Sequence, residues 1–207
     1  MNYENMKELK SILLLISSAV ILFVCFYYQN KIIEMKQTQR TLSRQIASTH
    51  KKEEYYNLNF DFNFKMNGLE APDVFCTERL KEGCFLSEMV KNRNLLIYRF
   101  SDNSCNPCYQ EELDSLQKIL PENCDFIKVL CSFKTTKDLL IFKITNNIEL
   151  PIYLIPFDSF KWIAEDDDKP YYFILHQNMK ISNIYVPDRN FPELNKQYLE
   201  GVMRFFI

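Results

Sequence analysis

The first pattern along the chain is an uncharged, apolar segment at residues 11–28, which follows a short N-terminal tail at residues 1–10. A helix rises about 1.5 Å per residue, so this segment is just long enough to cross a hydrocarbon core of about 30 Å. A signal-peptide core is shorter, about 7–15 residues, and ends at a small-residue cleavage site. Here Cys25-Phe26-Tyr27-Tyr28 ends the segment instead. The pattern predicts an uncleaved transmembrane anchor, with a buried core helix or a lipoprotein-type Cys25 as alternatives.

Residues 29–54 are polar and charged and contain neither proline nor glycine. Ile32, Met35, Leu42 and Ile46 recur at loose helical spacing, which predicts a helical stalk or linker. Because the apolar stripe is loose, a solvated linker helix is favoured over a coiled coil with a second copy. Basic side chains flank the apolar segment on both sides, so the positive-inside rule does not decide the orientation of the anchor.

Residues 56–66 alternate between apolar and polar side chains, and Gly68 follows them. A period of two residues is typical of a strand with one apolar face. We therefore expect an extra N-terminal strand that joins the sheet of a domain covering residues 55–207. The apolar positions are Tyr56, Leu58, Phe60, Phe62, Phe64 and Met66.

The rest of this domain alternates between strands and helices. A hairpin is expected at residues 73–80 and 83–90, where Cys76 and Cys84 could face each other as a structural disulfide or as two small buried residues. This order predicts an α/β domain whose sheet is covered on both faces by helices. The further expected elements are strands at 95–98, 125–131 and 150–155, a helix after residue 105, helices at 136–145 and 157–164, a hairpin at 171–176 and 180–186, and a terminal helix at 191–206.

Composition narrows the function classes. The 207 residues carry a formal net charge of −2, which gives no electrostatic case for binding nucleic acid. The 17 phenylalanines and 12 tyrosines favour a well-filled core with strands. His50 and His176 have no ligand-spaced partner and the chain has a single Cys-x-x-Cys, so a zinc site with four ligands is not expected.

The chemistry is concentrated at Cys105-Asn106-Pro107-Cys108, between a buried strand and a helix with Leu113 and Leu116 at helical spacing. Pro107 fits the first helical turn, where no backbone N–H is needed. Unpaired N–H groups and the helix dipole favour a thiolate at a helix N-terminus, so Cys105 is the expected nucleophile. Cys108, one turn further on, is the expected resolving thiol. This context indicates a redox pair.

The segment resembles the active-site strand and helix of the thioredoxin superfamily, and more narrowly those of the membrane-anchored TlpA/ResA-like thiol-disulfide oxidoreductases. Three further features carry the resemblance: Ala71-Pro72-Asp73-Val74-Phe75 at the beginning of the domain, Glu111 three residues after Cys108, and Lys169-Pro170 ahead of a strand. The resemblance covers about residues 69–207.

Three positions depart from the family pattern. Ser104 replaces the aromatic residue that usually precedes the first cysteine, and Arg99 stands where thioredoxins keep a buried acid. Lys169 precedes Pro170 in place of a small or β-branched residue. These departures bear on redox potential and on the choice of partner.

The resemblance implies a thioredoxin-like fold, a central mixed sheet flanked by helices, with Pro170 as a cis-proline beside a Cys105–Cys108 redox disulfide. It implies a thiol-disulfide oxidoreductase without cofactor or metal, in which Glu111 disfavours the thiolate or relays protons. The acidic run Asp166–Asp168 would lie beside the cysteines, as a solvated loop or as a group that selects cationic partners.

The same resemblance predicts the substrates, the electron donor and the location of the domain. Disulfides of extracytoplasmic proteins would be the substrates, with reduction favoured over oxidation, and a membrane electron donor would re-reduce the pair. The domain is expected in the periplasm, on a single-pass anchor in the cell membrane, because of the family and of a cysteine content that tolerates an oxidising compartment. The oligomeric state is left open.

Two other functions compete with this one. A peroxidase needs a threonine or serine three residues before its reactive cysteine and a proline upstream, and Asp102 occupies that position here. A non-catalytic binding or chaperone module would use the same fold with cysteines that are only structural. The intact cysteine pair at the start of a helix favours the enzyme.

Overall fold

The computed structural model of the chain describes residues 3–79, 82–104, 106–119, 125–162 and 168–206. The chain forms two compact units, Met1–Glu54 and Tyr55–Ile207. One long helix, α1 (Tyr3–Met66), makes up the described part of the first unit and contributes its last turns to the second.

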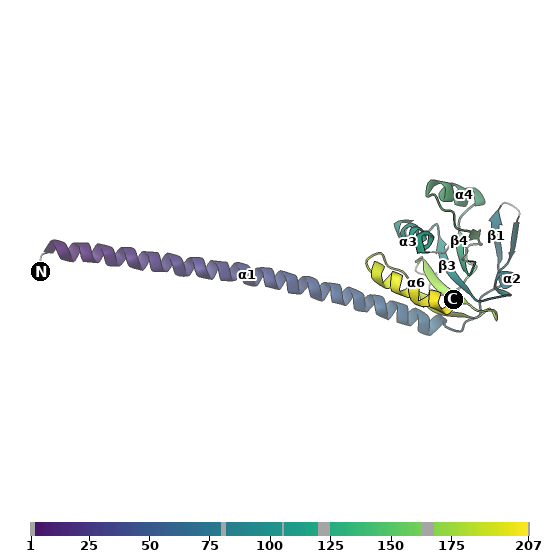
Figure 1. The fold of residues 1–207 in the computed structure, drawn as a ribbon, viewed down its shortest axis with the longest axis horizontal. Coiled ribbons are helices and arrows are strands. Elements are labelled where there is room, and N and C mark those ends of the chain that lie inside the picture. Colours follow the sequence, from purple (N-terminus) through teal and green to yellow (C-terminus); the bar gives the residue numbers. More distant parts are fainter. Residues whose placement is uncertain (1–2, 80–81, 105, 120–124, 163–167, 207) are drawn as a thin grey trace. The chain divides into compact units, whose positions relative to one another are not determined.

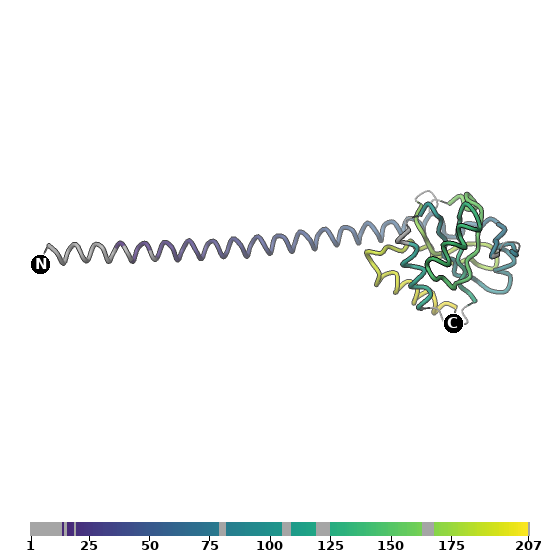
Figure 2. The backbone as a smooth tube through the Cα atoms, turned by 90° about the horizontal axis from the view of Figure 1, so that it is seen from above, coloured from purple at the N-terminus to yellow at the C-terminus, as the bar shows by residue number. Residues whose placement is uncertain are grey.

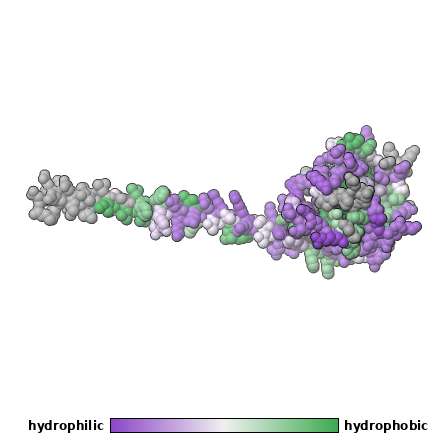
Figure 3. Space-filling model, in the orientation of Figure 1, coloured by the Kyte–Doolittle hydropathy of each residue, from purple (hydrophilic) through white to green (hydrophobic). Residues whose placement is uncertain are grey.

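In the first unit α1 continues without a break (Figure 2). Every described side chain from Leu14 to Glu54 is exposed, and the apolar ones are concentrated toward the N-terminal end of that stretch, green in Figure 3. By length and composition the helix is able to cross a membrane, and 0% of its most apolar 18-residue window is buried. Among the described residues of the apolar segment, no apolar side chain is buried within the first unit.

The last turns of α1 replace the extra strand that the alternation in residues 56–66 predicts, so that prediction is wrong. The same stretch also has a helical period: Tyr55, Asn59, Phe62 and Met66 are buried and are spaced three or four residues apart. Both periods fit these residues. The helix prevails because the chain enters them already helical and meets no glycine or proline before the helix ends.

Asparagine side chains of α1 bond backbone groups at the β7 edge of the sheet. The backbone N–H of Val186 donates to Asn59 Oδ1 (2.7 Å), and Asn59 Nδ2 donates to the carbonyl oxygen of Val186 (3.4 Å). Asn63 Nδ2 donates to the carbonyl oxygen of Ile184. A side-chain amide offers the same donor and acceptor as a peptide group, so α1 satisfies this edge while remaining a helix.

The described strands of the second unit are β1 Phe75–Arg79, β2 Glu82–Phe85, β3 Leu95–Ser101, β4 Ile127–Ser132, β5 Ile152–Leu154, β6 Tyr171–Leu175 and β7 Ile181–Tyr185. They form one mixed sheet (Figure 1). The strand order in this sheet is β2-β1-β5-β4-β3-β6-β7. β3, β4 and β5 are parallel neighbours, whereas β6 and β7 add antiparallel strands on one side. On the other side β1 pairs antiparallel with β5 and with β2.

Helices cover both faces of this sheet, which confirms the predicted α/β architecture. One face packs against α3 (Asn106–Ile119), α4 (Thr136–Thr145) and α6 (Pro192–Phe206). The other packs against α2 (Leu86–Val90) and the last turns of α1. Alternate residues of β3 supply the two cores, with Leu96, Tyr98 and Phe100 in the first and Leu95 and Ile97 in the second.

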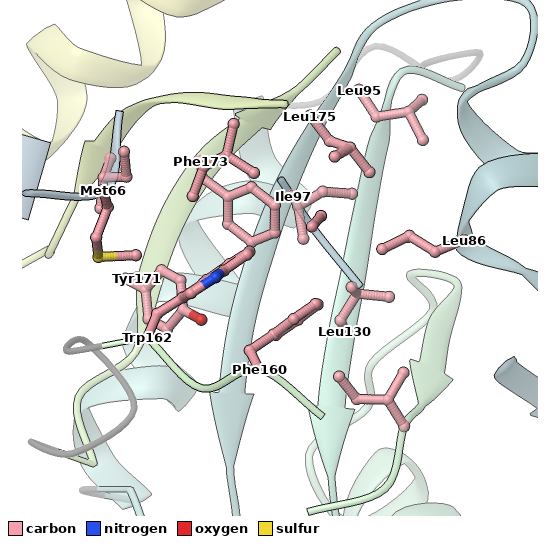
Figure 4. Close-up of a cluster of buried hydrophobic side chains, with 14 of the residues drawn as sticks. Met66, Leu86, Leu95, Ile97, Leu130, Phe160, Trp162, Tyr171, Phe173 and Leu175 are labelled. Atoms are coloured by element: carbon pink, nitrogen blue, oxygen red, sulfur yellow. The ribbon is translucent and has the colours of Figure 1, made fainter. Parts of the chain in front are cut away.

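Aromatic rings close the second core (Figure 4). Phe160 and Trp162 stack with their centroids 4.5 Å apart, and Trp162 meets Phe173 edge-on at 5.3 Å. The helix predicted at 157–164 is wrong in its described part, residues 157–162, which forms a turn with Asp158 at φ 60°. Residues two apart point to the same side only on an extended backbone, so burying Phe160 and Trp162 together excludes a helix there.

The predicted hairpin is present, but its second strand is shorter than expected because α2 begins at Leu86. Two carboxylates hold this helix start. Glu88 Oε2 accepts from the backbone N–H of Phe85 (2.8 Å), and Asp73 Oδ1 accepts from that of Ser87 (2.9 Å). Acceptors of this kind satisfy the free N–H groups of a first helical turn.

Candidate active site

The segment between β3 and α3 begins with a short loop held by two buried serines. Ser104 Oγ accepts from the backbone N–H of Ser101 (3.1 Å) and lies 3.2 Å from Ser101 Oγ. The N–H of Asp102 donates to the carbonyl oxygen of Ser132 on β4 (2.9 Å). The serine that replaces the family's aromatic residue thus fixes the turn that leads into the Cys-x-x-Cys.

Helix α3 follows this loop, and its first described residue is Asn106, so Pro107 and Cys108 lie in the first turn. This agrees with the helix predicted to start within the Cys-x-x-Cys. Cys105 lies outside the described residues, as does the predicted Cys105–Cys108 disulfide. The loop leaves the carboxyl end of a parallel strand, which is where open α/β sheets usually place their sites.

Arg99 is a buried cation near the end of β3, with 2% of its surface exposed. Its guanidinium donates to Ser132 Oγ (2.9 Å) and to the carbonyl oxygen of Phe100. A cleft of about 440 Å³ opens beside it, lined also by Asn103 of the cysteine loop and by Asp168. A buried guanidinium favours negative charge in its surroundings, so this cleft is electrostatically unlike a site built around a buried acid.

Pro170 is buried and borders a second groove of about 450 Å³. Asn103 lines the same groove, so the structure brings the predicted proline and the loop before Cys105 together. Leu58 of α1 and Val186 add apolar lining, which the sequence pattern did not reveal. Asp168 borders both the groove and the cleft, whereas Asp166 and Asp167 lie outside the described residues.

The cis peptide bond that the family resemblance implies before Pro170 is not present. No peptide bond among the described residues is cis, and Lys169 and Pro170 are both described. The trans form of an X–Pro bond is intrinsically favoured by about 0.5–1 kcal/mol, so a cis bond needs surroundings that select it. Here the preceding residue is an exposed lysine.

Two adjacent carboxyl groups on α3 have opposite surroundings. Glu111, the residue matched by the resemblance, is exposed. Glu112 is 5% exposed and accepts a hydrogen bond from the Tyr172 hydroxyl (2.8 Å). Burial raises the pKa of Glu112, while the Tyr172 hydrogen bond acts in the opposite direction and the charge of Glu111 adds to the increase. Glu112 is not among the predicted site residues, although its spacing from the buried Tyr109, Leu113 and Leu116 places it on the core side of the helix.

Glu112 is one end of a buried polar network. Asn195 Nδ2 donates to Glu112 Oε2 (3.4 Å), and the hydroxyls of Tyr185 (2.8 Å) and Tyr55 (3.4 Å) donate to Asn195 Oδ1. The network joins α3, α6 and the last turns of α1. Burial raises the pKa of Tyr98, and the nearby Glu112 adds to the increase. The Tyr98 hydroxyl has no hydrogen-bond partner in the described part of the chain.

Metal ligands are not grouped in this region. In the stretches that the structure describes, no cluster of three or more His, Cys, Asp or Glu side chains is arranged to hold an ion.

No family model and no curated protein matches this sequence. Solved structures do resemble the fold. A protein designated a protein disulfide isomerase from Bacteroides thetaiotaomicron superposes with a TM-score of 0.50 at 21% identity, over 65% of this chain and 88% of that one. A thiol:disulfide interchange protein from a Bacteroides species gives 0.48 at 16% identity, over 65% and 91% of the two chains. One named DsbE, a thiol:disulfide interchange protein from Chlorobium tepidum, gives 0.48 at 16%, over 65% and 96%.

The fold comparison and the strand order lead to the same assignment. The sheet of the second unit has parallel central strands and an antiparallel pair on one side. The helix that follows β3 begins within the Cys-x-x-Cys. The second unit has a thioredoxin-like fold, the fold of the Bacteroides thetaiotaomicron structure that superposes with a TM-score of 0.50.

Proposed function

We propose that the chain is a thiol-disulfide oxidoreductase that acts on protein disulfides through Cys105 and Cys108. The observation that carries this proposal is the start of α3 within the Cys-x-x-Cys, directly after a loop that lines the same groove as Pro170. A thiol at such a helix start is favoured as a thiolate, and the groove offers an extended substrate segment a place beside it.

The proposed reaction is two successive exchanges. The Cys105 thiolate attacks one sulfur of the substrate disulfide; a Cys105–substrate bond forms as the substrate S–S bond breaks, and the released substrate thiolate takes up a proton. Cys108 then loses its proton and attacks the Cys105 sulfur. The Cys105–Cys108 disulfide forms, the second substrate thiolate leaves, and two electrons have passed to the substrate without a cofactor.

The surrounding residues have supporting roles in this proposal. Pro170 lines the groove and leaves the neighbouring backbone to pair with the substrate chain. Glu111, exposed and three residues after Cys108, disfavours the thiolate through its charge or relays protons to solvent. Arg99 acts in the opposite direction, because a buried positive charge near the cleft stabilises an anion.

We propose further that α1 anchors the protein to the cell membrane in a single pass, with the domain in the periplasm. The exposed apolar stretch of α1 and its length support the anchor. A membrane electron donor would then return the disulfide to the dithiol, which makes the protein a reductant of extracytoplasmic disulfides. The direction of exchange follows the family resemblance.

The reduction potential of the pair tests this proposal. The full-length chain in detergent is equilibrated with dithiothreitol or glutathione buffers, and the Cys105 and Cys108 thiols are counted by alkylation and mass spectrometry. We expect a reversible two-electron couple near the thioredoxin value of about −270 mV. A value near −120 mV would make the protein an oxidant and assign a dominant role to Arg99.

The competing function is a non-catalytic binding module. It predicts no reversible couple at this pair, and it predicts that Cys105→Ser keeps the function of the protein. The enzyme proposal predicts that Cys105→Ser abolishes disulfide exchange, whereas Cys25→Ser, which changes an exposed cysteine in the apolar segment, leaves exchange unchanged.

A further inference from the structure

A second pair of cysteines lies at the edge of the sheet, on the hairpin of β1 and β2. Cys76 and Cys84 are directly opposite each other in the antiparallel register. Opposed residues in such a ladder have their Cα atoms about 4.5–5.5 Å apart and their side chains on the same face. Disulfides span Cα separations of about 4.4–6.8 Å. The backbone of the hairpin therefore already satisfies the main geometric requirement for a bond.

Two neighbouring contacts show that this register is well defined. Phe75 and Phe85, the adjacent pair in the ladder, meet edge-on with their centroids 5.4 Å apart. At Gly83 a Cβ atom would lie 2.4 Å from the carbonyl oxygen of Cys76, so glycine permits the close approach of β2 to β1. A one-residue slip would place the two cysteines on opposite faces, and both contacts oppose that slip.

The two thiols differ in access. Cys76 is completely buried, at 0% exposure, whereas Cys84 is half-buried and is reached first from solvent. Both are free thiols in the structure. Burial raises the pKa of Cys76 to about 12 and also raises that of Cys84, where Glu88 adds to the increase and Lys128 opposes it. These thiols are therefore unlike a low-pKa catalytic pair and match a slowly formed structural bond.

We propose that Cys76 and Cys84 form a second disulfide, separate from the redox pair, when the domain meets a disulfide donor. The Cys84 thiolate attacks the donor's S–S bond and a mixed disulfide forms as one donor thiol leaves. Cys76 then loses its proton and attacks the Cys84 sulfur, which expels the second donor thiol. Two protein thiols are oxidised to one disulfide and the donor disulfide is reduced to two thiols. The bond fastens the edge strand β2 to its neighbour β1.

Peptide mapping tests this inference directly. The full-length chain carrying Cys105→Ser and Cys108→Ser is treated in detergent with glutathione disulfide at mildly alkaline pH, blocked with N-ethylmaleimide and digested with trypsin. Trypsin cuts after Arg79 and Lys81, between the two cysteines, so the bond would join peptides 66–79 and 82–91. We expect this joined species in the oxidised sample and its loss on reduction.

Matched variants identify the bond and its effect. Cys84→Ala and Cys76→Ala should each abolish the joined species, whereas Cys131→Ala, at another buried cysteine, should leave it. The oxidised form should also melt roughly 5–10 °C above the reduced form, because a short closed loop restricts the unfolded chain. The inference is overturned if Cys84 stops at the glutathione adduct, or if both thiols remain open to N-ethylmaleimide in the unfolded, oxidised protein.

Discussion

The two faces of the sheet are covered by side chains of different chemistry. The face covered by α2 and the end of α1 is closed by hydrocarbon, with Phe160, Trp162 and Phe173 packed ring against ring. The face covered by α3 and α6 includes a carboxyl group, Glu112, bound to a phenol and an amide within an otherwise apolar core. Among the described residues, only the second of these cores includes a buried carboxyl group.

Because of this difference, the two faces should contribute differently to the pH dependence of the free energy of unfolding. Burial of aromatic rings contributes a free energy that does not depend on protonation. A buried carboxyl group with a raised pKa makes the free energy of unfolding depend on pH. Since Glu112 lies four residues after Cys108 on the same helix, the pH-dependent face is also the one that carries the proposed chemistry.

The largest effect is expected on the hydrocarbon face. Phe173→Ala removes a ring that is 0% exposed and should lower the free energy of unfolding by about 3–5 kcal/mol, equally at pH 5 and pH 8. Urea unfolding followed by the fluorescence of the single tryptophan, Trp162, measures this change. Phe64→Ala is the control, because that ring is 80% exposed and its loss should change stability by less than about 0.5 kcal/mol. A strongly pH-dependent loss in Phe173→Ala would contradict the distinction between the faces.

Tyr172→Phe should have the next largest effect, and it should depend on pH. The variant keeps the buried ring but removes the donor to Glu112 Oε1. A hydrogen bond to a charged group contributes about 1.5–3 kcal/mol, so the loss should approach that size at pH 8 and be smaller at pH 5. Because this bond opposes the increase in the pKa of Glu112, its removal should raise that pKa further. An equal loss at both pH values would show that the carboxyl group does not ionise in this range.

Glu112→Gln should have a smaller effect that reverses with pH. The pKa of Glu112 is raised above 4.5, so its favourable contribution is complete below that value and is lost as the pH rises through the folded-state pKa. Glutamine keeps an acceptor for Tyr172 and does not titrate. The variant should be less stable by about 1 kcal/mol at pH 4.5 and at least as stable as the parent at pH 8. Urea midpoints across this range give the slope, and an unchanged slope would exclude Glu112 as its source.

Features that depend on short segments of the sequence were predictable, whereas features that depend on distant contacts were not. The site signal is local: the Cys-x-x-Cys follows a buried strand and lies at the start of a helix. This segment, together with residues 71–75, Glu111 and Lys169-Pro170, was the basis for predicting the fold. The terminal helix and the β6–β7 hairpin likewise follow from short-range pattern. The strand predicted at residues 56–66 was wrong because their apolar positions fit both a period of two and a helical period. Only the preceding helix decides between the two structures.

The polar network could not be predicted because it depends on contacts far apart in the chain. Tyr55 and Asn195 are 140 residues apart, and Glu112 and Asn195 are 83 apart. A carboxyl group at position 112 is visible in the sequence as the core-side member of a glutamate pair, but its partners are not. Arg99 is similar: the predicted strand ends one residue before it, and the hydroxyl of Ser132 that accepts from its guanidinium is far away in the sequence.

The smallest effect on stability is expected at the neighbouring carboxylate, Glu111. This variant distinguishes the role of the exposed carboxyl group from that of the buried one. Glu111→Gln alters an exposed side chain and should change the free energy of unfolding by less than about 0.5 kcal/mol. Because the charge of Glu111 adds to the increase in the pKa of Glu112, the variant should weaken the pH dependence without abolishing it. Removing a negative charge near the cysteine pair should still favour the thiolate, so Cys105 should react faster with iodoacetamide at a fixed pH. Stability and alkylation rate are measured on the same samples for Glu111→Gln and Glu112→Gln. If Glu111→Gln alters stability and leaves alkylation unchanged, the exposed and buried carboxyl groups do not have the separate roles assigned to them.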